Sequence, residues 1–356
     1  MIGTSVFLGE NLNEAIKENL VSMKEHGFTG IFSSLHIPED ESEYYLKRLK
    51  TLGEWAIELE MEIMMDVSGS SLTNVGLSFD RPKEILETGV TGLRIDYGIS
   101  NEVIIKLSKD MKVSLNASTL TEKDIEELIE GGANFNHLEA WHNYYPRPET
   151  GLDKKSFIKK NQWLNQLGFR VVAFVPGEDK LRGPLFKGLP SLEKHRAIHP
   201  LAAAIELIED CFVDDIYIGD PGLTQNTQIQ FESYFKNKTM LLFAEQEAKS
   251  LYALSVVGIH QNRWDNARDV IRSANARFKK MDTIIPESPI RRDKGSVTID
   301  NINYGRYMGE IQISLTDLPI DEKVNVVAKI IEKDQSLLQW CKGGMPFEIR
   351  LNNIRE

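Results

Sequence analysis

Residues 92–98 read Gly-Leu-Arg-Ile-Asp-Tyr-Gly, and this short stretch shows how the first two thirds of the chain is built. Successive side chains of a strand point to opposite faces, so the apolar residues fall on one face and Arg94 and Asp96 on the other. In a barrel covered by helices, the apolar face packs under the helices. Arg94 and Asp96 are therefore expected to point into the barrel.

Apolar runs of this kind recur up to residue 219. There are eight in all: 2–8, 30–35, 62–68, 92–98, 112–118, 135–141, 170–175 and 215–219. Helix signals fill the gaps, since Asn11 or Asn13 can cap the first helix and Thr119 and Glu122 have capping-box spacing before a later one. Eight strand–helix units over about 240 residues predict a (β/α)8 TIM barrel, with a doubly wound open sheet as the alternative.

The pattern changes near residue 240. A mixed segment, 239–281, leads to Pro286 and Pro289. Strand-like runs then follow without long helices between them, at 296–300, 309–315, 324–331 and 347–351. This arrangement predicts a small, mainly antiparallel β-domain. We therefore divide the chain into a barrel domain, 1–238, and a β-domain, 239–356.

Composition excludes several classes of protein. The 356 residues include 42 Lys and Arg against 53 Asp and Glu, a net charge of −11, which argues against a nucleic-acid partner. No apolar run approaches the roughly 18 residues of a membrane helix, so no membrane partner is expected. Cys211 and Cys341 lie far apart without a Cys/His cluster, which indicates a cytoplasmic setting without zinc. Neither G-x-G-x-x-G nor a Walker loop occurs, and no cofactor is expected.

Strand alternation sends polar side chains into the barrel from four successive strands. The inward set is Met64, Asp66, Ser68, Arg94, Asp96, Ser114, Asn116, Ser118, His137, Glu139 and Trp141. Buried charges are costly unless they are paired, solvated or functional, and function is the usual reason near the C-terminal ends of barrel strands. Asp66 and Glu139 are expected there. A structural ion pair is the alternative for Arg94 with Asp96, and a satisfied core histidine is the alternative for His137.

Two loops add polar and aromatic groups. Residues 142–152 read His-Asn-Tyr-Tyr-Pro-Arg-Pro-Glu-Thr-Gly-Leu, and their rings suit a sugar or simply pack the loop down. Residues 176–188, followed by His195 and Arg196, concentrate glycine and positive charge. They form either an anion pocket or a solvated surface loop. Asp220, in a Gly-Asp-Pro-Gly turn, either shapes that turn or takes part in the site.

Several motifs resemble one bacterial family. They are Thr4-Ser5-Val6-Phe7, Leu93-Arg94-Ile95-Asp96-Tyr97-Gly98, Leu115-Asn116-Ala117-Ser118, the loop 142–152, the run 294–300 and Tyr304-Gly305-Arg306-Tyr307-Met308-Gly309-Glu310. The likeness covers essentially the whole chain. The family has long been labelled "outer surface protein" and joins a TIM barrel to a cyclophilin-like β-domain. Some members are 6-phospho-N-acetylmuramidases.

The resemblance implies a cytoplasmic glycosidase that splits N-acetylmuramic acid 6-phosphate from N-acetylglucosamine in a phosphorylated disaccharide, during peptidoglycan recycling. Glycoside cleavage generally uses two carboxyl groups. The catalytic candidates are Asp66, Asp96 and Glu139, and the choice of pair stays open. The substrate-binding candidates are inward or loop residues able to hold hydroxyl, phosphate or carboxylate groups: Arg94, Asn116, His142, Asn143, Tyr145, Arg147, Glu149, Lys180, Arg182, His195 and Asp220.

Two other functions stay open from the residues alone. One is a metal-dependent TIM-barrel isomerase or lyase with ligands among Asp66, Asp96, His137 and Glu139. The other is a non-catalytic phosphosugar-binding protein. The β-domain is expected either to cover the barrel mouth, with Arg291, Arg292 or Arg306 reaching the substrate, or to build a homodimer.

Overall fold

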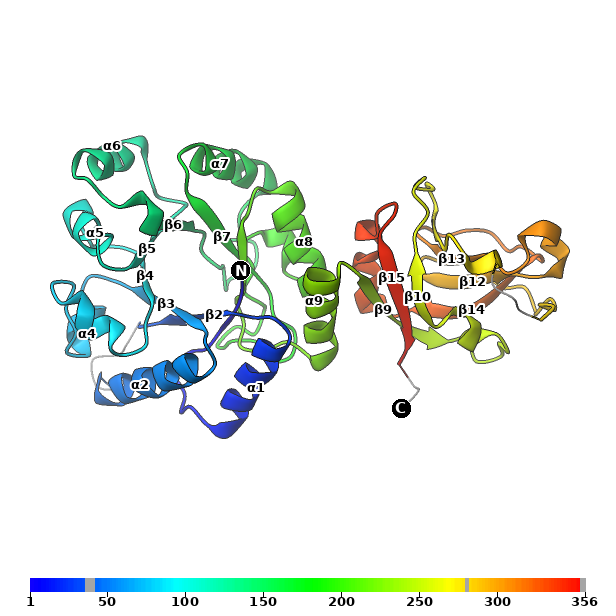
Figure 1. The fold of residues 1–356 in the computed structure, drawn as a ribbon, viewed down its shortest axis with the longest axis horizontal. Helices are drawn as coiled ribbons and strands as arrows, with labels where there is room; N and C mark the ends of the chain where they lie inside the picture. Colours follow the sequence, from blue (N-terminus) through cyan, green and yellow to red (C-terminus); the bar gives the residue numbers. More distant parts are fainter. Residues whose placement is uncertain (36–41, 279–281, 353–356) are drawn as a thin grey trace. The chain divides into compact units, whose positions relative to one another are not determined.

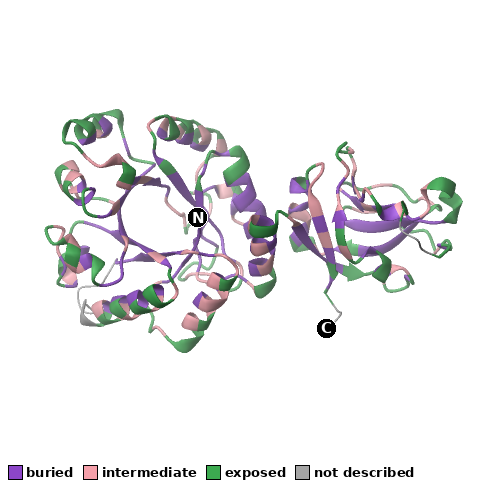
Figure 2. Ribbon diagram, viewed as in Figure 1, coloured by how far each residue is buried: buried purple, intermediate pink, exposed green. Residues whose placement is uncertain are grey.

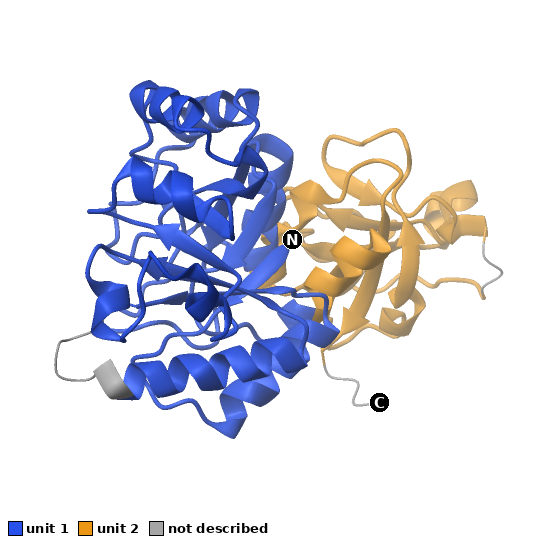
Figure 3. Cartoon of the chain, turned by 60° about the vertical axis from the view of Figure 1, so that its left-hand side comes forward, with its two compact units in different colours: residues 1–228 blue, residues 229–356 orange. Residues whose placement is uncertain are grey.

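The chain forms two compact units in a computed structural model that describes residues 1–35, 42–278 and 282–352. Unit 1 comprises Met1–Gln228 and unit 2 comprises Ile229–Glu356 (Figure 3). The boundary lies inside helix α9 (Gln225–Asn237). Each unit has its own sheet, so each is described by itself.

Unit 1 is a closed barrel of eight parallel strands (Figure 1). The strands are β1 (Ile2–Ser5), β2 (Gly30–Ser34), β3 (Glu62–Val67), β4 (Gly92–Ile95), β5 (Lys112–Asn116), β6 (Leu138–Trp141), β7 (Arg170–Val175) and β8 (Asp215–Ile218). Neighbours in the chain pair in order, and β1 also pairs with β8, which closes the sheet. The predicted TIM barrel is confirmed, and the open-sheet alternative is wrong.

Helices between the strands form the outer layer, and their outward faces are the exposed part of unit 1 in Figure 2. They are α1 (Glu14–Glu25), α2 (Ser42–Glu58), α3 (Ser71–Asn74), α4 (Pro82–Leu86), α5 (Asn101–Leu107), α6 (Glu122–Glu130), α7 (Lys154–Gln166) and α8 (Pro200–Asp210), before α9. Asn13 caps α1 through its side chain. The expected capping box at Thr119 and Glu122 is wrong, because Thr121 and Asp124 form it instead.

The sixth strand begins later than expected. Residues Phe135–His137 form a turn of 3-10 helix, and β6 starts only at Leu138. His137 therefore lies outside the barrel interior, where its Nδ1 is 2.8 Å from the Ser108 carbonyl oxygen. The expectation that His137 points inward is wrong, since a residue of this turn does not follow strand alternation.

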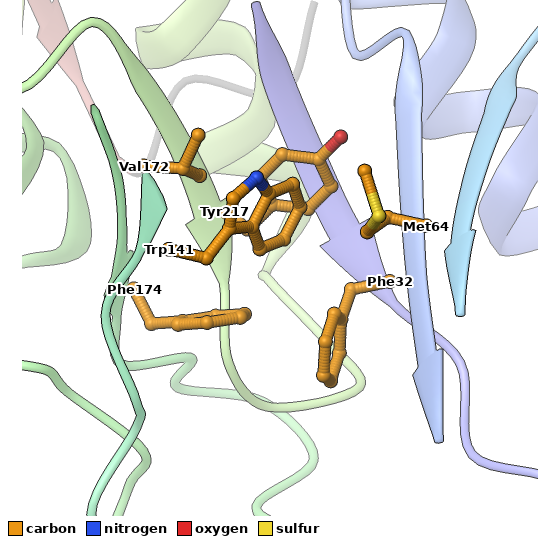
Figure 4. Packing of buried hydrophobic residues seen from close by; sticks show 6 residues of the cluster. All are labelled: Phe32, Met64, Trp141, Val172, Phe174 and Tyr217. Carbon is orange, nitrogen blue, oxygen red and sulfur yellow. The ribbon is translucent and has the colours of Figure 1, made fainter. Parts of the chain in front are cut away.

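Large side chains fill the middle of the barrel. This central plug consists of Phe32, Met64, Trp141, Val172, Phe174 and Tyr217 (Figure 4). The Trp141 and Tyr217 rings are 4.5 Å apart, and Phe32 and Phe174 are 5.0 Å apart. Gly3 leaves room for Tyr217, because a Cβ at that position would lie 2.1 Å from its ring. The plug divides the barrel interior into two separate ends.

Unit 2 is built on one seven-stranded sheet with the order β10-β15-β9-β14-β12-β13-β11. Its strands are β9 (Met240–Gln246), β10 (Gly258–Gln261), β11 (Val270–Arg272), β12 (Ser296–Asp300), β13 (Ile311–Ser314), β14 (Val324–Ile330) and β15 (Pro346–Leu351). All neighbours are antiparallel except β9 and β15. The predicted mainly antiparallel β-domain is confirmed. Among the described residues, no helix combines the length and apolar character needed to cross a membrane.

Candidate active site

A cavity of about 190 Å3 opens at the C-terminal end of the barrel strands, above the central plug. Its lining combines charged, amide and aromatic side chains: Phe32, Asp66, Arg94, Asp96, Asn143, Tyr144, Tyr145 and Phe174. Asp66 is the fifth residue of β3, and Asp96 directly follows β4. These are the strand ends at which barrel enzymes carry their catalytic groups.

One arginine links the two carboxylates of this cavity. Arg94 Nη1 is 2.6 Å from Asp66 Oδ1 and 3.7 Å from Asp96 Oδ1. The Asp66 and Arg94 side chains are almost fully buried, whereas the Asp96 side chain keeps 24% of its surface exposed. The short contact pairs Arg94 closely with Asp66, whereas the longer contact holds Asp96 more weakly. The cavity therefore contains two carboxyl groups in unequal surroundings.

Two amides hold this charged group in place. Asn143 lies in the loop after β6, and its side-chain oxygen accepts a hydrogen bond from Arg94 Nη2. Its backbone carbonyl accepts a second hydrogen bond, from the Ser191 hydroxyl at 2.8 Å. Asn116, the last residue of β5, approaches Asp96 Oδ1 at 3.4 Å through its Nδ2. The structure thus brings Asp66, Arg94, Asp96 and Asn143, all of them sequence candidates, to one cavity, with Asn116 beside it.

Aromatic rings form the remaining wall. Tyr145, a sequence candidate, lines the cavity together with Tyr144, whose ring lies edge-on to Phe32 at 5.9 Å and to Phe174 at 5.2 Å. Burial raises the pKa of the Tyr144 hydroxyl, so this group stays protonated. Tyr144, Phe32 and Phe174 are absent from the predicted site. Strand alternation applied to β2 and β7 could have identified the two phenylalanines as inward residues.

Arg182 lies next to this aromatic wall. Its guanidinium carbon is 3.7 Å from the centre of the Phe7 ring, and its Nη1 donates a hydrogen bond to the Tyr144 hydroxyl. Asp220 fixes the backbone of this loop, because its carboxylate accepts N–H groups from Gly177, Arg182 and Leu189, each at 2.9 Å. Asp220 is fully buried by these contacts. It shapes the loop, and it does not line the cavity.

Glu139 lies at the opposite end of the barrel, although it was expected beside Asp66. It is the second residue of β6 and lines a cavity of only about 10 Å3 together with the starts of other strands, including Glu62 and Asp215. Burial raises the pKa of Glu139, and Trp141 Nε1 donates a hydrogen bond to it at 2.8 Å. The central plug separates it from Asp66, so the expected placement of Glu139 is wrong.

Two histidine candidates are buried outside the cavity. His142 packs against Phe157 of α7 at 4.2 Å, and its Nε2 is 2.6 Å from Asn161 Oδ1. Burial lowers its pKa to about 4, so the ring is neutral near pH 7. His195 lies 2.9 Å from Glu206 of α8 and is fully buried. Neither side chain lines the cavity, so the structure gives the expectation that these two histidines hold substrate no support, and it stays a prediction.

Three further candidates are exposed loop residues: Arg147, Glu149 and Lys180. Glu149 has a positive φ of 71° and donates its N–H to Glu193, while the carbonyl of Arg147 accepts from Thr150. These contacts shape the loop through the backbone and leave the charged side chains in solvent. None of the three lines the cavity.

The described residues contain no group of three or more His, Cys, Asp or Glu side chains arranged to hold a metal ion. The ligand set considered from the sequence is dispersed, because Asp66 and Asp96 lie at one end of the barrel, Glu139 at the other and His137 outside it. The groups gathered at the cavity are instead two carboxyls, one shared guanidinium, amides and aromatic rings. This set suits a polar, ring-shaped ligand and proton transfer.

Comparison with known proteins identifies the family. Residues 2–233 match the N-terminal domain of 6-phospho-N-acetylmuramidase, and residues 240–350 match its C-terminal domain. The chain is also similar to a conserved protein of unknown function from Enterococcus faecalis, with 47% identity over 99% of this chain and 97% of that one, at a TM-score of 0.91.

An uncharacterized B. cereus protein shares the fold, with 24% identity over 98% of this chain and 99% of that one, at a TM-score of 0.74. A search of curated proteins finds no significant match. Because family domains cover both the barrel and the β-domain, the chain belongs to the 6-phospho-N-acetylmuramidase family and is a glycosidase.

Proposed function

We propose that this protein hydrolyses the bond between N-acetylmuramic acid 6-phosphate and N-acetylglucosamine in a phosphorylated disaccharide, during peptidoglycan recycling in the cytoplasm. The observation that carries the proposal is the pair of carboxyl groups, Asp66 and Asp96, in an aromatic-walled cavity at the catalytic end of the barrel. The cytoplasmic setting agrees with two cysteines that are both free and buried.

The catalytic pair in this proposal is Asp66 and Asp96. Glycosidases generally place two carboxyl groups beside the scissile bond, one to protonate the departing oxygen and the other to act on the sugar. Arg94 stabilises the ionised form of the nearer carboxyl, and Asn116 and Asn143 supply amide groups to the same cavity. Tyr144 and Tyr145 offer ring faces and hydroxyls of the kind that sugar rings pack against.

The anionic part of the substrate is assigned to Arg182. Arg94 already contacts two carboxylates, which compensate its positive charge, so it attracts a phosphate only weakly. Arg182 contacts the cavity wall through Tyr144 and keeps part of its surface exposed. A guanidinium is well suited to the oxygens of a phosphate or of the lactyl carboxylate. Arg182 would therefore select the phosphorylated sugar.

The direct test supplies the purified protein with the phosphorylated disaccharide and, in parallel, with its unphosphorylated form. We expect release of N-acetylglucosamine from the first at a rate far above that from the second, whether or not EDTA is present. Tight binding without release would contradict the proposal and indicate a phosphosugar-binding protein. Loss of release in EDTA that added metal restores would instead indicate a metal-dependent enzyme.

A further inference from the structure

We infer that the hydrolysis retains the anomeric configuration of the sugar, with Asp66 as the nucleophile that forms a covalent glycosyl intermediate and Asp96 as the acid and base. This inference rests on the proposed function, and it adds the stereochemical course and the division of roles. The geometry of the cavity supports it, because Asp66 and Asp96 are the two carboxyl groups that line it among the described residues.

The distance between the carboxyl groups distinguishes a retaining from an inverting glycosidase. Their Oδ1 atoms lie 2.6 and 3.7 Å from the same Arg94 nitrogen, so they are no further apart than these two distances combined. Inverting glycosidases separate their carboxyl groups by roughly 6.5–9.5 Å to leave room for a water molecule, whereas retaining enzymes use roughly 5–5.5 Å. The shared contact to Arg94 thus keeps the two Oδ1 atoms closer together than the lower end of the inverting range.

The space between the carboxyl groups is also occupied. Arg94 Nη1 contacts both of them, and Nη2 of the same guanidinium donates a hydrogen bond to Asn143. An attacking water that had to lie between the pair would need to displace this buried guanidinium. A double displacement needs no water between the two carboxyl groups while the glycosidic bond breaks. The geometry therefore favours a double displacement.

The unequal surroundings of the two carboxyls assign their roles. Asp66 has the short contact to Arg94 and a side chain that is only 6% exposed, so its carboxylate is paired with a guanidinium and fixed in orientation, as a nucleophile needs. Asp96 has the longer contact and a side chain that is 24% exposed. An acid that later activates water needs access to solvent, and Asp96 has it.

The reaction consists of two successive displacements at the anomeric carbon. Asp66 attacks the anomeric carbon, the bond from that carbon to the bridging oxygen breaks, and the bridging oxygen takes the bond electrons and the proton of Asp96, so that N-acetylglucosamine leaves. Water then gives a proton to Asp96 and attacks the same carbon, which releases Asp66 as a carboxylate. Each displacement inverts the carbon, so the product keeps the configuration of the substrate.

The first experiment follows the wild-type enzyme by proton NMR during the first minutes of the reaction. We expect the released N-acetylmuramic acid 6-phosphate to appear first as the anomer present in the substrate. Initial appearance of the other anomer would overturn this inference and leave the proposed function intact. Absence of any release would overturn the proposed function, and the inference with it, so the two failures are distinguishable.

The second experiment tests the roles with Asp96→Gly and a 4-nitrophenyl glycoside of N-acetylmuramic acid 6-phosphate, whose leaving group needs no acid. Without the base the intermediate accumulates, and we expect acid-quenched protein to gain the mass of one glycosyl group on the peptide that contains Asp66. Added azide should restore turnover at least about tenfold and yield a glycosyl azide of the substrate's configuration.

Three results would remove Asp66 from this role. They are a glycosyl azide of the opposite configuration, an adduct on another residue, and an oxazoline formed by the substrate's own acetamido group without any protein adduct. Asp66→Gly with azide gives a matched comparison, because direct displacement by azide should then yield the opposite configuration. The test does not depend on that variant's folding, since the Asp96→Gly and wild-type measurements stand alone.

Discussion

The two ends of the barrel contain similar residues and differ in what surrounds them. At the C-terminal end, Arg94 contacts two carboxylates, Asp66 and Asp96, beside a cavity of about 190 Å3. At the N-terminal end, Asp215 is paired with Arg170 at 2.6 Å, and the neighbouring cavity of about 10 Å3 has room for roughly one water molecule. Inward carboxylates are therefore not enough to make a site. Open space beside two carboxylates that share Arg94 distinguishes the C-terminal end.

Replacing one carboxyl at each end of the barrel should give the largest difference in activity. We expect Asp66→Asn to lower turnover of the phosphorylated disaccharide by on the order of 1,000-fold, because the amide cannot serve as the nucleophile. Glu139→Gln should stay close to wild type, since glutamine can still accept the hydrogen bond of Trp141. Initial rates of N-acetylglucosamine release measure both variants, with circular dichroism as the check on folding.

The opposite result would be just as clear. If Glu139→Gln lost activity while its circular dichroism and unfolding transition matched those of the wild type, the N-terminal end of the barrel would have to be part of the chemistry. The separation by the central plug would then not hold in the working enzyme.

Strand alternation predicts whether a side chain points into the barrel. It cannot predict the position of that side chain along the barrel axis. One row of paired residues runs from the end of β2 to the start of β7: Ser34, Asp66, Arg94, Ser114, Glu139 and Arg170. Asp66 is near the end of its strand and Glu139 near the start, because the strands of a closed barrel are staggered. That stagger is set by closure of the whole sheet, so no single segment reveals it.

The loops were harder to predict for a related reason. His142 directly follows β6 and continues its alternation toward the helix layer, so the sequence did contain a signal for its burial against α7. The positions of Tyr144 and Arg182 carried no such signal. They depend on contacts between distant parts of the chain, such as the hydrogen bond from the Arg182 N–H to Asp220. Composition identified the right loops without showing which side chains reach the cavity.

His142 packs against helix α7 and so belongs to neither end of the barrel interior. Its pKa of about 4 in the folded protein is below the usual 6.5, so the unfolded chain binds a proton that the folded one does not. Stability should therefore fall as pH drops from about 6.5 to about 4, by up to roughly 3 kcal/mol. Urea unfolding at several pH values, compared between wild type and His142→Gln, isolates this contribution from other titrating groups.

The variant should show a shallower loss of stability over this range, because glutamine has no proton to gain. Equal slopes for the two proteins would mean that the imidazole is as solvated when folded as when unfolded. His142 would then belong at the barrel mouth with the substrate-binding residues, which is the placement that the burial against Phe157 contradicts.

The central plug can be tested through the glycine that accommodates it. In Gly3→Ala the new Cβ would lie 2.1 Å from the Tyr217 ring, so the ring or the strand must shift. We expect the free energy of unfolding to fall by roughly 1–3 kcal/mol, as for other overpacked cores. Gly9→Ala is the matched control, because its nearest neighbour is the Tyr45 hydroxyl at an ordinary 3.6 Å. Equal stability of the two variants would show that the plug adapts easily.

The smallest expected effect concerns Arg182, the cation beside the cavity at the C-terminal end of the barrel. Arg182→Met should keep the packing on Phe7 and remove the charge, which lowers kcat/KM for the phosphorylated disaccharide about tenfold, or ~1.4 kcal/mol. The rate on the unphosphorylated disaccharide should change little. Arg147→Met removes a charge of the same kind from an exposed loop side chain and serves as the control. Equal losses on both substrates would mean that Arg182 only positions Tyr144, and that the phosphate is held elsewhere.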